Sequence, residues 1–391
     1  MALPYTNKKK KFINFTISIF SFILIFCFIE IALRIFTPGI LQERLQANVS
    51  ADFQLMFDHS KFHFEKNSVG KAKHTEYEHW VAHDDVGFRN TCFNNKNKPS
   101  KILIIGDSNI YGIGVKNDQI ISCHLTKLGI PTYSLSVPAS DTFTYLKLIE
   151  RNLKRLKNKN YIDENTTFIL TITVGNDFES ILDLDLLDIK KENLNFFSVD
   201  DNTSEIKKNR IVFRDSTFLS ILNKFFHHSF LSKSYFFNYV KVTLVRSGLR
   251  HKFQKMPKGV YTDFAGSTYY EKNVQFEVKK FFSGFNKLIL FLQHKSNNNF
   301  AILFFPNPVE LDIVRLENTA KISNFNASDI DIDFKRNLIF QACAKFNIHC
   351  LDPTKILDGR KDFYKYDNHP NSLGTEKIAN FLYKKFVILT K

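Results

Sequence analysis

The stretch KILIIGDSNIYGIGV, residues 101–115, decides the fold, because an apolar run of strand character breaks at Gly106-Asp107-Ser108. Gly, Asp and Ser are common turn residues, so an ordinary strand-to-loop turn is one interpretation. The other interpretation is that Ser108 is a nucleophile displayed at the carboxyl end of a parallel strand. The rest of the chain has to decide between the two.

From Lys101 onward, apolar runs alternate with segments of helical periodicity. Strands that alternate with helices imply right-handed βαβ units and a parallel sheet covered on both faces. The sequence therefore predicts an α/β fold: a three-layer α/β/α sandwich with a mostly parallel five-stranded sheet. The expected strands are KILIIG (101–106), PTYSLSV (131–137), TTFILTITVG (166–175), NFAILFFP (299–306) and IHCLDP (348–353).

The N-terminal segment predicts a membrane anchor. Lysines at 8–11 precede a run of about 18 uncharged residues that ends at Glu30, which is near the minimum for a membrane-spanning helix. We expect residues 1–11 to form a basic cytoplasmic tail and residues 12–36 a transmembrane helix, because Lys-rich flanks stay in the cytoplasm. A cleaved signal peptide competes, but no small-x-small cleavage site follows the run. A retained anchor puts everything after about residue 37 outside the cytoplasm.

The net charge of +15 allows nucleic acid, anionic lipid or an acidic polymer as a partner. An extracytoplasmic domain argues against nucleic acid, so the membrane is the first expected partner. The five cysteines match no zinc-binding spacing, and no metal is expected. One disulfide, with Cys343 and Cys350 as the nearest pair, and buried free thiols both stay open.

Two segments fall outside the strand–helix alternation. Residues 37–100 are predicted to be a linker or lead-in segment before a domain that spans residues 101–391. Within that domain, residues at about 179–276 form an insertion in which aromatic and basic residues interleave. A lid or a helix pair on the membrane surface is one interpretation of the insertion. A helical insertion packed on the core with a solvated basic face is the other.

Three short stretches with reactive side chains lie at predicted strand or loop ends: Gly106-Asp107-Ser108, TVGNDF and YKYDNHPNSLG. Ester cleavage by a serine needs a base for the hydroxyl proton and a group that orients the base. His369 has the chemistry of the base, and Asp367 could hold its tautomer from two residues away. Asn176 offers a side-chain N–H₂ to a developing oxyanion. Asp107 and Asp177 are expected to fix their loops by hydrogen bonds.

Together these blocks resemble those of the SGNH hydrolases, the GDSL-type esterase family. IIGDSN resembles the first block, with the nucleophile at Ser108, although Asn109 replaces the usual Leu. TVGNDF resembles the third block, whose oxyanion Asn corresponds to Asn176. DNHPNSLG resembles the last block, whose acid and base correspond to Asp367 and His369.

The resemblance runs from about residue 101 to 391, and HDDVGFRN, residues 83–90, resembles the lead-in of membrane-tethered members. In the second block, SLSVPASDTF, the oxyanion Gly of the family falls on Ala139 and a frequent Asn falls on Ser134. The family role uses a backbone N–H, which Ala retains. A Cβ matters there only if the backbone needs a positive φ.

The resemblance implies a flavodoxin-like SGNH fold and a single-pass, membrane-anchored serine esterase without cofactor or metal. It would remove acyl groups, with acetyl as the expected one, from an envelope glycan or lipid in the periplasm or at the cell surface. Ser108 would attack, His369 would act as base and Asp367 would orient it. The amides of Ser108 and Ala139 and the side chain of Asn176 would form the oxyanion hole.

Two alternatives stay open beside the esterase. The same triad could pass the acyl group to an envelope or exported polysaccharide, which makes the protein an O-acetyltransferase. The chain could also be a non-catalytic envelope-binding protein that retains the fold.

Overall fold

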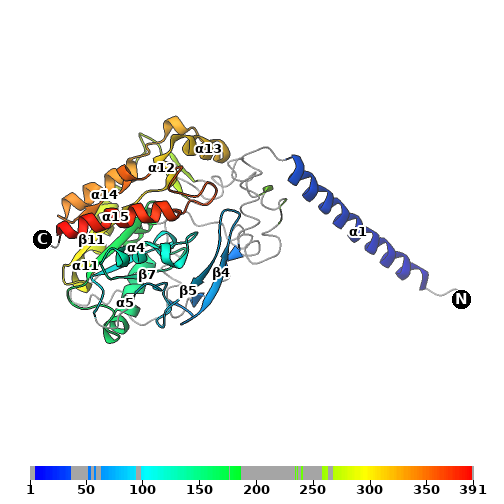
Figure 1. The fold of residues 1–391 in the computed structure, drawn as a ribbon. Coiled ribbons are helices and arrows are strands. Elements are labelled where there is room, and N and C mark those ends of the chain that lie inside the picture. Colours follow the sequence, from blue (N-terminus) through cyan, green and yellow to red (C-terminus); the bar gives the residue numbers. More distant parts are fainter. Residues whose placement is uncertain are drawn as a thin grey trace.

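The computed structural model describes residues 5–36, 52–53, 57–58, 63–93, 98–175, 177–185, 234, 236, 239–240, 258–262 and 267–389. Over these residues the predicted α/β fold is confirmed, with helices on both faces of a parallel sheet (Figure 1). Asn176 and most of the 179–276 insertion lie outside the described residues. Both interpretations of that insertion therefore stay predictions.

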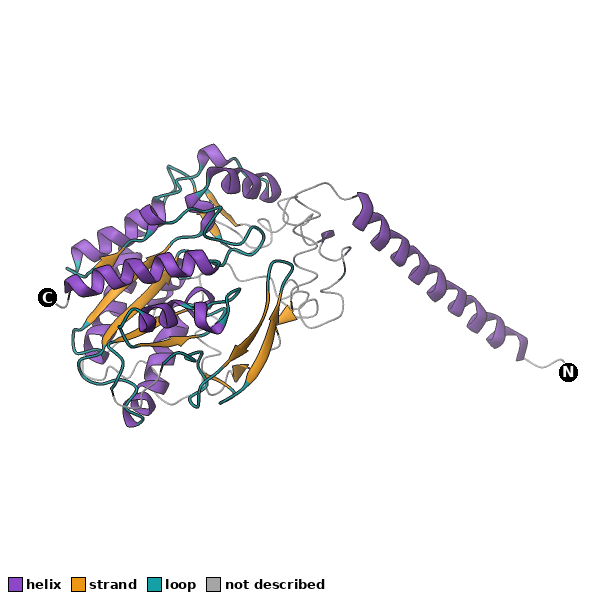
Figure 2. Cartoon of the chain, in the orientation of Figure 1, coloured by secondary structure: helices purple, strands orange, loops and turns teal. Residues whose placement is uncertain are grey.

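The sheet is parallel throughout and contains the five expected strands. They are β6 (Ile102–Gly106), β7 (Thr132–Ser136), β8 (Thr167–Thr173), β11 (Phe300–Phe305) and β12 (Cys350–Leu351). Their spatial order is β12-β11-β8-β6-β7, which in chain order is the flavodoxin-like arrangement 2-1-3-4-5. The strand order reverses between β6 and β8, and ligands of such sheets bind beyond the strand ends at that point. Figure 2 shows the strands between two layers of helix.

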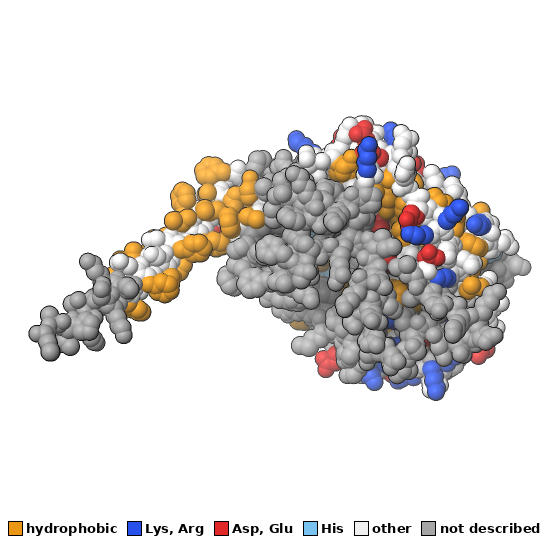
Figure 3. Space-filling view, turned by 180° about the vertical axis from the view of Figure 1, so that it is seen from behind, with side chains coloured by type: hydrophobic (Ala, Val, Ile, Leu, Met, Phe, Trp, Pro, Cys, Tyr) orange, Lys and Arg blue, Asp and Glu red, His pale blue; other side chains and the backbone are white. Residues whose placement is uncertain are grey.

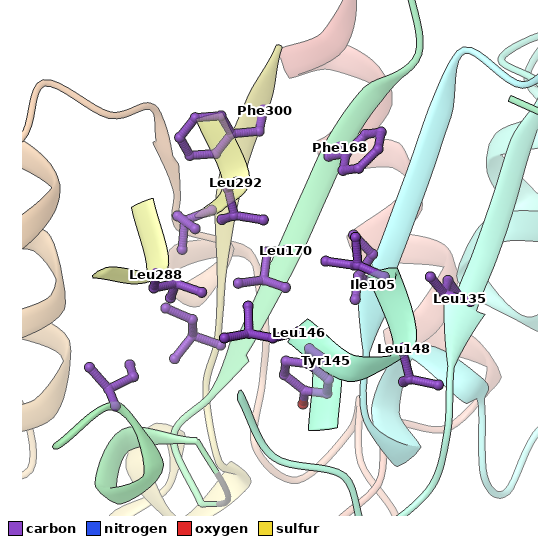
Figure 4. Close-up of a cluster of buried hydrophobic side chains, with 14 of the residues drawn as sticks. Ile105, Leu135, Tyr145, Leu146, Leu148, Phe168, Leu170, Leu288, Leu292 and Phe300 are labelled. Carbon is purple, nitrogen blue, oxygen red and sulfur yellow. The ribbon is translucent and has the colours of Figure 1, made fainter. Parts of the chain in front are cut away.

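Side chains of β6 alternate between two hydrophobic clusters, as the pleat of a strand requires. Ile102 and Ile104 belong to the cluster under α4 (Ile121–Lys127) and α15 (Ser372–Leu389). Ile105 belongs to the cluster on the opposite face, part of which Figure 4 shows. The helices on that face are α5 (Thr142–Asn158), α6 (Phe178–Leu184), α11 (Val278–Lys295) and α14 (Phe334–Lys345). Each large apolar side chain buried in this way contributes about 1.5–3 kcal/mol.

Several shorter elements connect these layers. They are α3 (Ser108–Tyr111), α12 (Pro308–Leu311), α13 (Ile313–Ser323) and the 3₁₀ turns η1 (Asn117–Gln119), η3 (Ala327–Asp329) and η4 (Thr354–Ile356). In the described part of the insertion, β9 (Val260–Thr262) pairs antiparallel with β10 (Thr268–Tyr270). The insertion therefore includes a strand pair, which its aromatic and basic sequence did not indicate.

The lead-in differs from the linker interpretation over residues 63–93. Here β4 (Val69–Lys73) and β5 (Glu78–Ala82) form an antiparallel hairpin. The other pairs are β1 (Asp52–Phe53) with β4, and β2 (Phe57–Asp58) with β3 (His63–Phe64). Ala72 and Val81 are fully buried in the cluster that also holds Ile105. This segment is therefore part of the folded domain, and its lack of a continuous apolar run explains why its sequence resembles a linker.

Helix α1 (Tyr5–Phe36) carries exposed apolar side chains between Phe12 and Phe36 (Figure 3). In the described part of the chain it is the one helix long and apolar enough to cross a membrane, over the 25 residues Phe12–Phe36. Length and composition fit a membrane anchor or a signal sequence equally.

Two disulfides join four of the five cysteines. Cys343–Cys350, the nearest pair in sequence, joins the end of α14 to β12, with 6.1 Å between the Cα atoms. Cys92–Cys123 joins the lead-in to α4, with 5.2 Å between the Cα atoms. The remaining thiol, Cys27, lies on α1.

Candidate active site

Ser108 is the first residue after the turn that ends β6, and it opens the one-turn helix α3. Asp107 caps this helix, because its side chain accepts the N–H of Asn109 at 2.9 Å. Gly112 ends the helix in the left-handed region (φ +83°), and its N–H donates to the carbonyl oxygen of Ser108 at 3.0 Å. Asp107 thus has the loop-fixing role expected of it, and Ser108 stands beside the point where the strand order reverses.

Asp367 and His369 are in direct contact in the loop 364–369, called the acid–base loop below. The imidazole Nδ1 of His369 is hydrogen-bonded to Asp367 Oδ1. Burial acts to raise the pKa of Asp367, but the charge of His369 and hydrogen bonds from His369 and Tyr77 lower that pKa well below its usual range. Asp367 is therefore ionised, so Nδ1 must be the donor. Nε2 is then the basic nitrogen of His369.

The same charges act on His369. Burial lowers the pKa of the imidazole, but the carboxylate of Asp367 raises it more, so that the net shift is upward. Asp107 adds to the rise through its negative charge.

A hydrogen bond fixes the two segments to each other. The hydroxyl of Tyr364 donates to the carbonyl oxygen of Gly114 at 2.5 Å. Gly114 has φ +90°, and a Cβ there would lie 2.5 Å from the Tyr364 ring. Only glycine fits both the backbone and the space. The structure thus brings the loop after Ser108 against the loop that carries His369.

Arg89, from the HDDVGFRN segment, holds the turn after Ser108 from inside the protein. It is fully buried, and its guanidinium donates to the carbonyl oxygens of Tyr111, Gly112 and Val115 at 3.2, 2.6 and 2.6 Å. Burial lowers the pKa of Arg89 to about 10, so the side chain stays charged near neutral pH. From the sequence alone this segment carried only a resemblance; the hydrogen bonds of Arg89 explain why an arginine stands there.

Asp84 of the same segment is also a structural residue. Its Oδ1 accepts the N–H groups of Val86, Gly87 and Phe88 at 2.9, 2.8 and 2.9 Å. Its Oδ2 accepts the hydroxyl of Tyr133, on β7, at 2.7 Å. The segment is therefore hydrogen-bonded to the parallel sheet through β7, the strand next to β6 and the turn that carries Ser108.

The two other residues predicted for the oxyanion hole differ in what the structure describes. Ala139 lies in the loop after β7 with φ +57°, in the left-handed region. A residue with a Cβ adopts this conformation at a cost of about 1–2 kcal/mol. Asn176 lies outside the described residues, so its role stays a prediction.

Asp177, next to Asn176, fixes the end of β8. It accepts the N–H of Thr173 at 2.6 Å and the hydroxyl of Tyr145 at 3.1 Å. Burial, followed by the negative charge of Asp107, raises the pKa of Asp177 well above its usual range. The loop-fixing role expected of Asp177 is confirmed.

The residues that hold Asp367 from outside its own loop carried no signal in the sequence. Tyr77 donates its hydroxyl to Asp367 Oδ2 at 2.6 Å, and Glu76 accepts backbone N–H groups of the acid–base loop. Both lie in the segment interpreted as a linker. Among the described residues, no group of three or more His, Cys, Asp or Glu side chains is placed to hold a metal ion.

Comparison with known proteins gives a likeness in fold alone. No family model and no curated protein matches the chain. A solved structure from Bacteroides fragilis, provisionally named an acylhydrolase, is 8% identical with a TM-score of 0.35 and matches 78% of this chain and 94% of its own. The YxiM protein of Bacillus subtilis is 9% identical with a TM-score of 0.35, over 84% of this chain and 65% of its own. Similarity at this level says nothing about activity, which has to be argued from the site.

Proposed function

We propose that this chain is a serine acyl hydrolase of the SGNH type. The observation that carries the proposal is the hydrogen-bonded pair of ionised Asp367 and His369, in a loop joined through Tyr364 and Gly114 to the turn after Ser108. A nucleophile, a base and a group that orients the base are the parts that acyl transfer through serine requires.

In the proposed reaction, Ser108 Oγ attacks the ester carbonyl carbon while His369 Nε2 takes the hydroxyl proton. The carbonyl electron pair moves to its oxygen, which the amides of Ser108 and Ala139 and the side chain of Asn176 stabilise. The electron pair returns, the ester C–O bond breaks, and His369 gives its proton to the leaving alkoxide. Water then attacks the acyl-enzyme with His369 again as base, and the carboxylic acid and free Ser108 are formed.

The backbone of Ala139 supports catalysis over the binding-only alternative. A left-handed conformation at a residue with a Cβ is maintained only where the surroundings impose it, and such residues cluster at functional sites. The φ of +57° keeps residue 139 in the conformation that a glycine would adopt.

We further propose that the domain acts outside the cytoplasm on an acylated envelope glycan or lipid, with α1 as a single-pass anchor. Two observations support this location. The disulfides Cys92–Cys123 and Cys343–Cys350 persist in oxidising compartments. Four lysines at residues 8–11 precede the apolar part of α1 and favour a cytoplasmic N-terminus.

The test is labelling of the full chain, in detergent micelles, with a fluorophosphonate probe that reacts with activated serines. Wild type should be labelled and Ser108→Ala should not. Ser296→Ala is a matched control, because Ser296 is also buried but ends α11 away from the strand ends, and it should label like wild type. A folded wild-type chain that stays unlabelled contradicts the proposal.

A further inference from the structure

The tip of the β4–β5 hairpin, residues 74–77, holds the backbone of the acid–base loop. Glu76 Oε1 accepts the N–H of Lys365 at 2.7 Å, and its Oε2 accepts those of Tyr366 and Asp367 at 2.9 and 3.0 Å. Three successive N–H groups that converge on one point form an anion-binding concavity. Here the anion is a carboxylate of the protein itself.

Tyr77, the next residue of the tip, completes the surroundings of Asp367. Its hydroxyl donates to Oδ2 at 2.6 Å, while Oδ1 faces His369. Burial, then the charge of Asp367, raises the pKa of Tyr77 far above its usual value, so the phenol keeps its proton and donates it to the carboxylate. The ring also lies against that of Tyr364, with 5.1 Å between centroids.

We propose that the hairpin tip is the positioning element of the acid–base pair. Glu76 fixes the loop backbone, and Tyr77 turns the carboxylate of Asp367 so that its other oxygen meets His369. The inference rests on the proposed function and adds two residues to it. The hydrogen bonds of both side chains described above go to the acid–base loop and not to Ser108, so both are positioning residues.

The geometry of the carboxylate explains why a second donor matters. Asp367 lies two residues before its histidine, on a loop without regular structure, and an exposed oxygen would let water compete for the carboxylate. A donor at each oxygen fixes the rotation of the group, as a supporting shell around a reactive side chain must. The hairpin is held in place relative to the sheet, because Ala72 and Val81 are buried in the hydrophobic core.

The first test removes one hydroxyl. In the full chain, Tyr77→Phe should slow fluorophosphonate labelling about tenfold to a hundredfold, which is the value of one hydrogen bond to a charged group. The acidic limb of its pH–rate profile, set by His369, should move as well. This limb should move to higher pH if Asp367 stays in place, because Tyr77 then no longer shares the negative charge of the carboxylate with His369. It should move to lower pH if the carboxylate swings away from the imidazole. Both shifts support positioning.

Tyr261→Phe is the matched control, since Tyr261 also donates to a carboxylate, that of Glu271, outside the site. It should leave the labelling rate and the pH profile unchanged. If Tyr77→Phe reacts like wild type with an unmoved acidic limb, the role of Tyr77 is overturned.

The second test does not depend on activity. Glu76→Gln should speed hydrogen–deuterium exchange at the amides of residues 365–367 about tenfold or more, since it removes charged acceptors. Glu78→Gln, on the outer face of the same hairpin where Glu78 pairs with Lys71, should not. Unchanged exchange in Glu76→Gln overturns the anchoring role. If wild type fails to label, the proposed function falls, while the exchange result still decides the role of the hairpin tip.

Discussion

Arg89 and Gly112 are joined by a 2.6 Å hydrogen bond that links the lead-in to the turn after Ser108. The donor is a fully buried guanidinium and the acceptor is the carbonyl oxygen of the residue that ends α3. A charge of this kind is stable inside a protein only when its N–H groups are satisfied, and here three backbone carbonyl oxygens and the side-chain Oδ1 of Asn117 accept them. The shape of the turn after Ser108 is therefore set by a residue that precedes the parallel sheet in the chain.

Arg89→Gln should lower the free energy of unfolding by about 3 kcal/mol or more, because several charge-assisted hydrogen bonds are lost and buried carbonyl groups are left without partners. Urea unfolding of the full chain in micelles measures the change. Lys157→Gln, which removes an exposed ion pair with Glu164, should hardly move the midpoint. Equal effects of the two substitutions would contradict the role of Arg89.

Asp367→Asn should slow labelling of Ser108 by about a thousandfold or more, because an amide no longer holds Nδ1 of His369 as a donor. The pH dependence should change too. In wild type the reaction is lost on acidification, as the imidazole of His369 becomes protonated, and the raised pKa of His369 moves this loss to higher pH than for an ordinary histidine. Without the carboxylate, burial lowers that pKa, and the acidic limb should move down. An unmoved limb in a folded variant is inconsistent with the pair described here.

Ala139→Gly should stabilise the loop after β7 by about 1 kcal/mol, because glycine has no Cβ clash at positive φ. The labelling rate should be kept or increased. Ala139→Val, with a branched Cβ, should slow labelling about tenfold or more at this backbone conformation. Ala320→Gly, inside helix α13, is the control, and it should lower the free energy of unfolding by about 1 kcal/mol because glycine is unfavourable in a helix. Loss of stability in Ala139→Gly would refute the account of residue 139.

The disulfides predict that one thiol, that of Cys27, is alkylated in the unreduced, denatured chain. Mass spectrometry gives the count directly. Replacement of Cys92 and Cys123 by Ser should cost about 4 kcal/mol by loop-closure entropy for a separation of 31 residues. The same change at Cys343 and Cys350, only 7 residues apart, should cost about 2 kcal/mol. Alkylation of four or five thiols would contradict both bridges.

The parallel sheet could be predicted from the sequence because strands that are buried on both faces have continuous apolar sequences. All five residues of β6 are buried, and its sequence ILIIG is apolar throughout. The hairpin β4–β5 has no such run. Its inward positions include Gly70, Ala72 and His79, which are also common in loops.

The site divides in the same way. Ser108, Asp367 and His369 stand in short motifs that can be read locally. Glu76 and Tyr77 act on the acid–base loop from a distant part of the chain, and a single sequence holds no pattern that pairs them. The positive φ of Ala139 could not be predicted either, because alanine has no preference for that conformation.

The contact between Tyr77 and Asp367 spans 290 residues, and this separation has a consequence for biosynthesis. Chains are made from the N-terminus, and their early parts fold first. The hairpin and all five strands of the parallel sheet precede the acid–base loop in the chain and are synthesised before it. Until the last part of the chain arrives, Ser108 has neither a base nor a carboxylate to orient one. Under the proposed function, Ser108 would therefore acquire its reactivity only after synthesis is nearly complete.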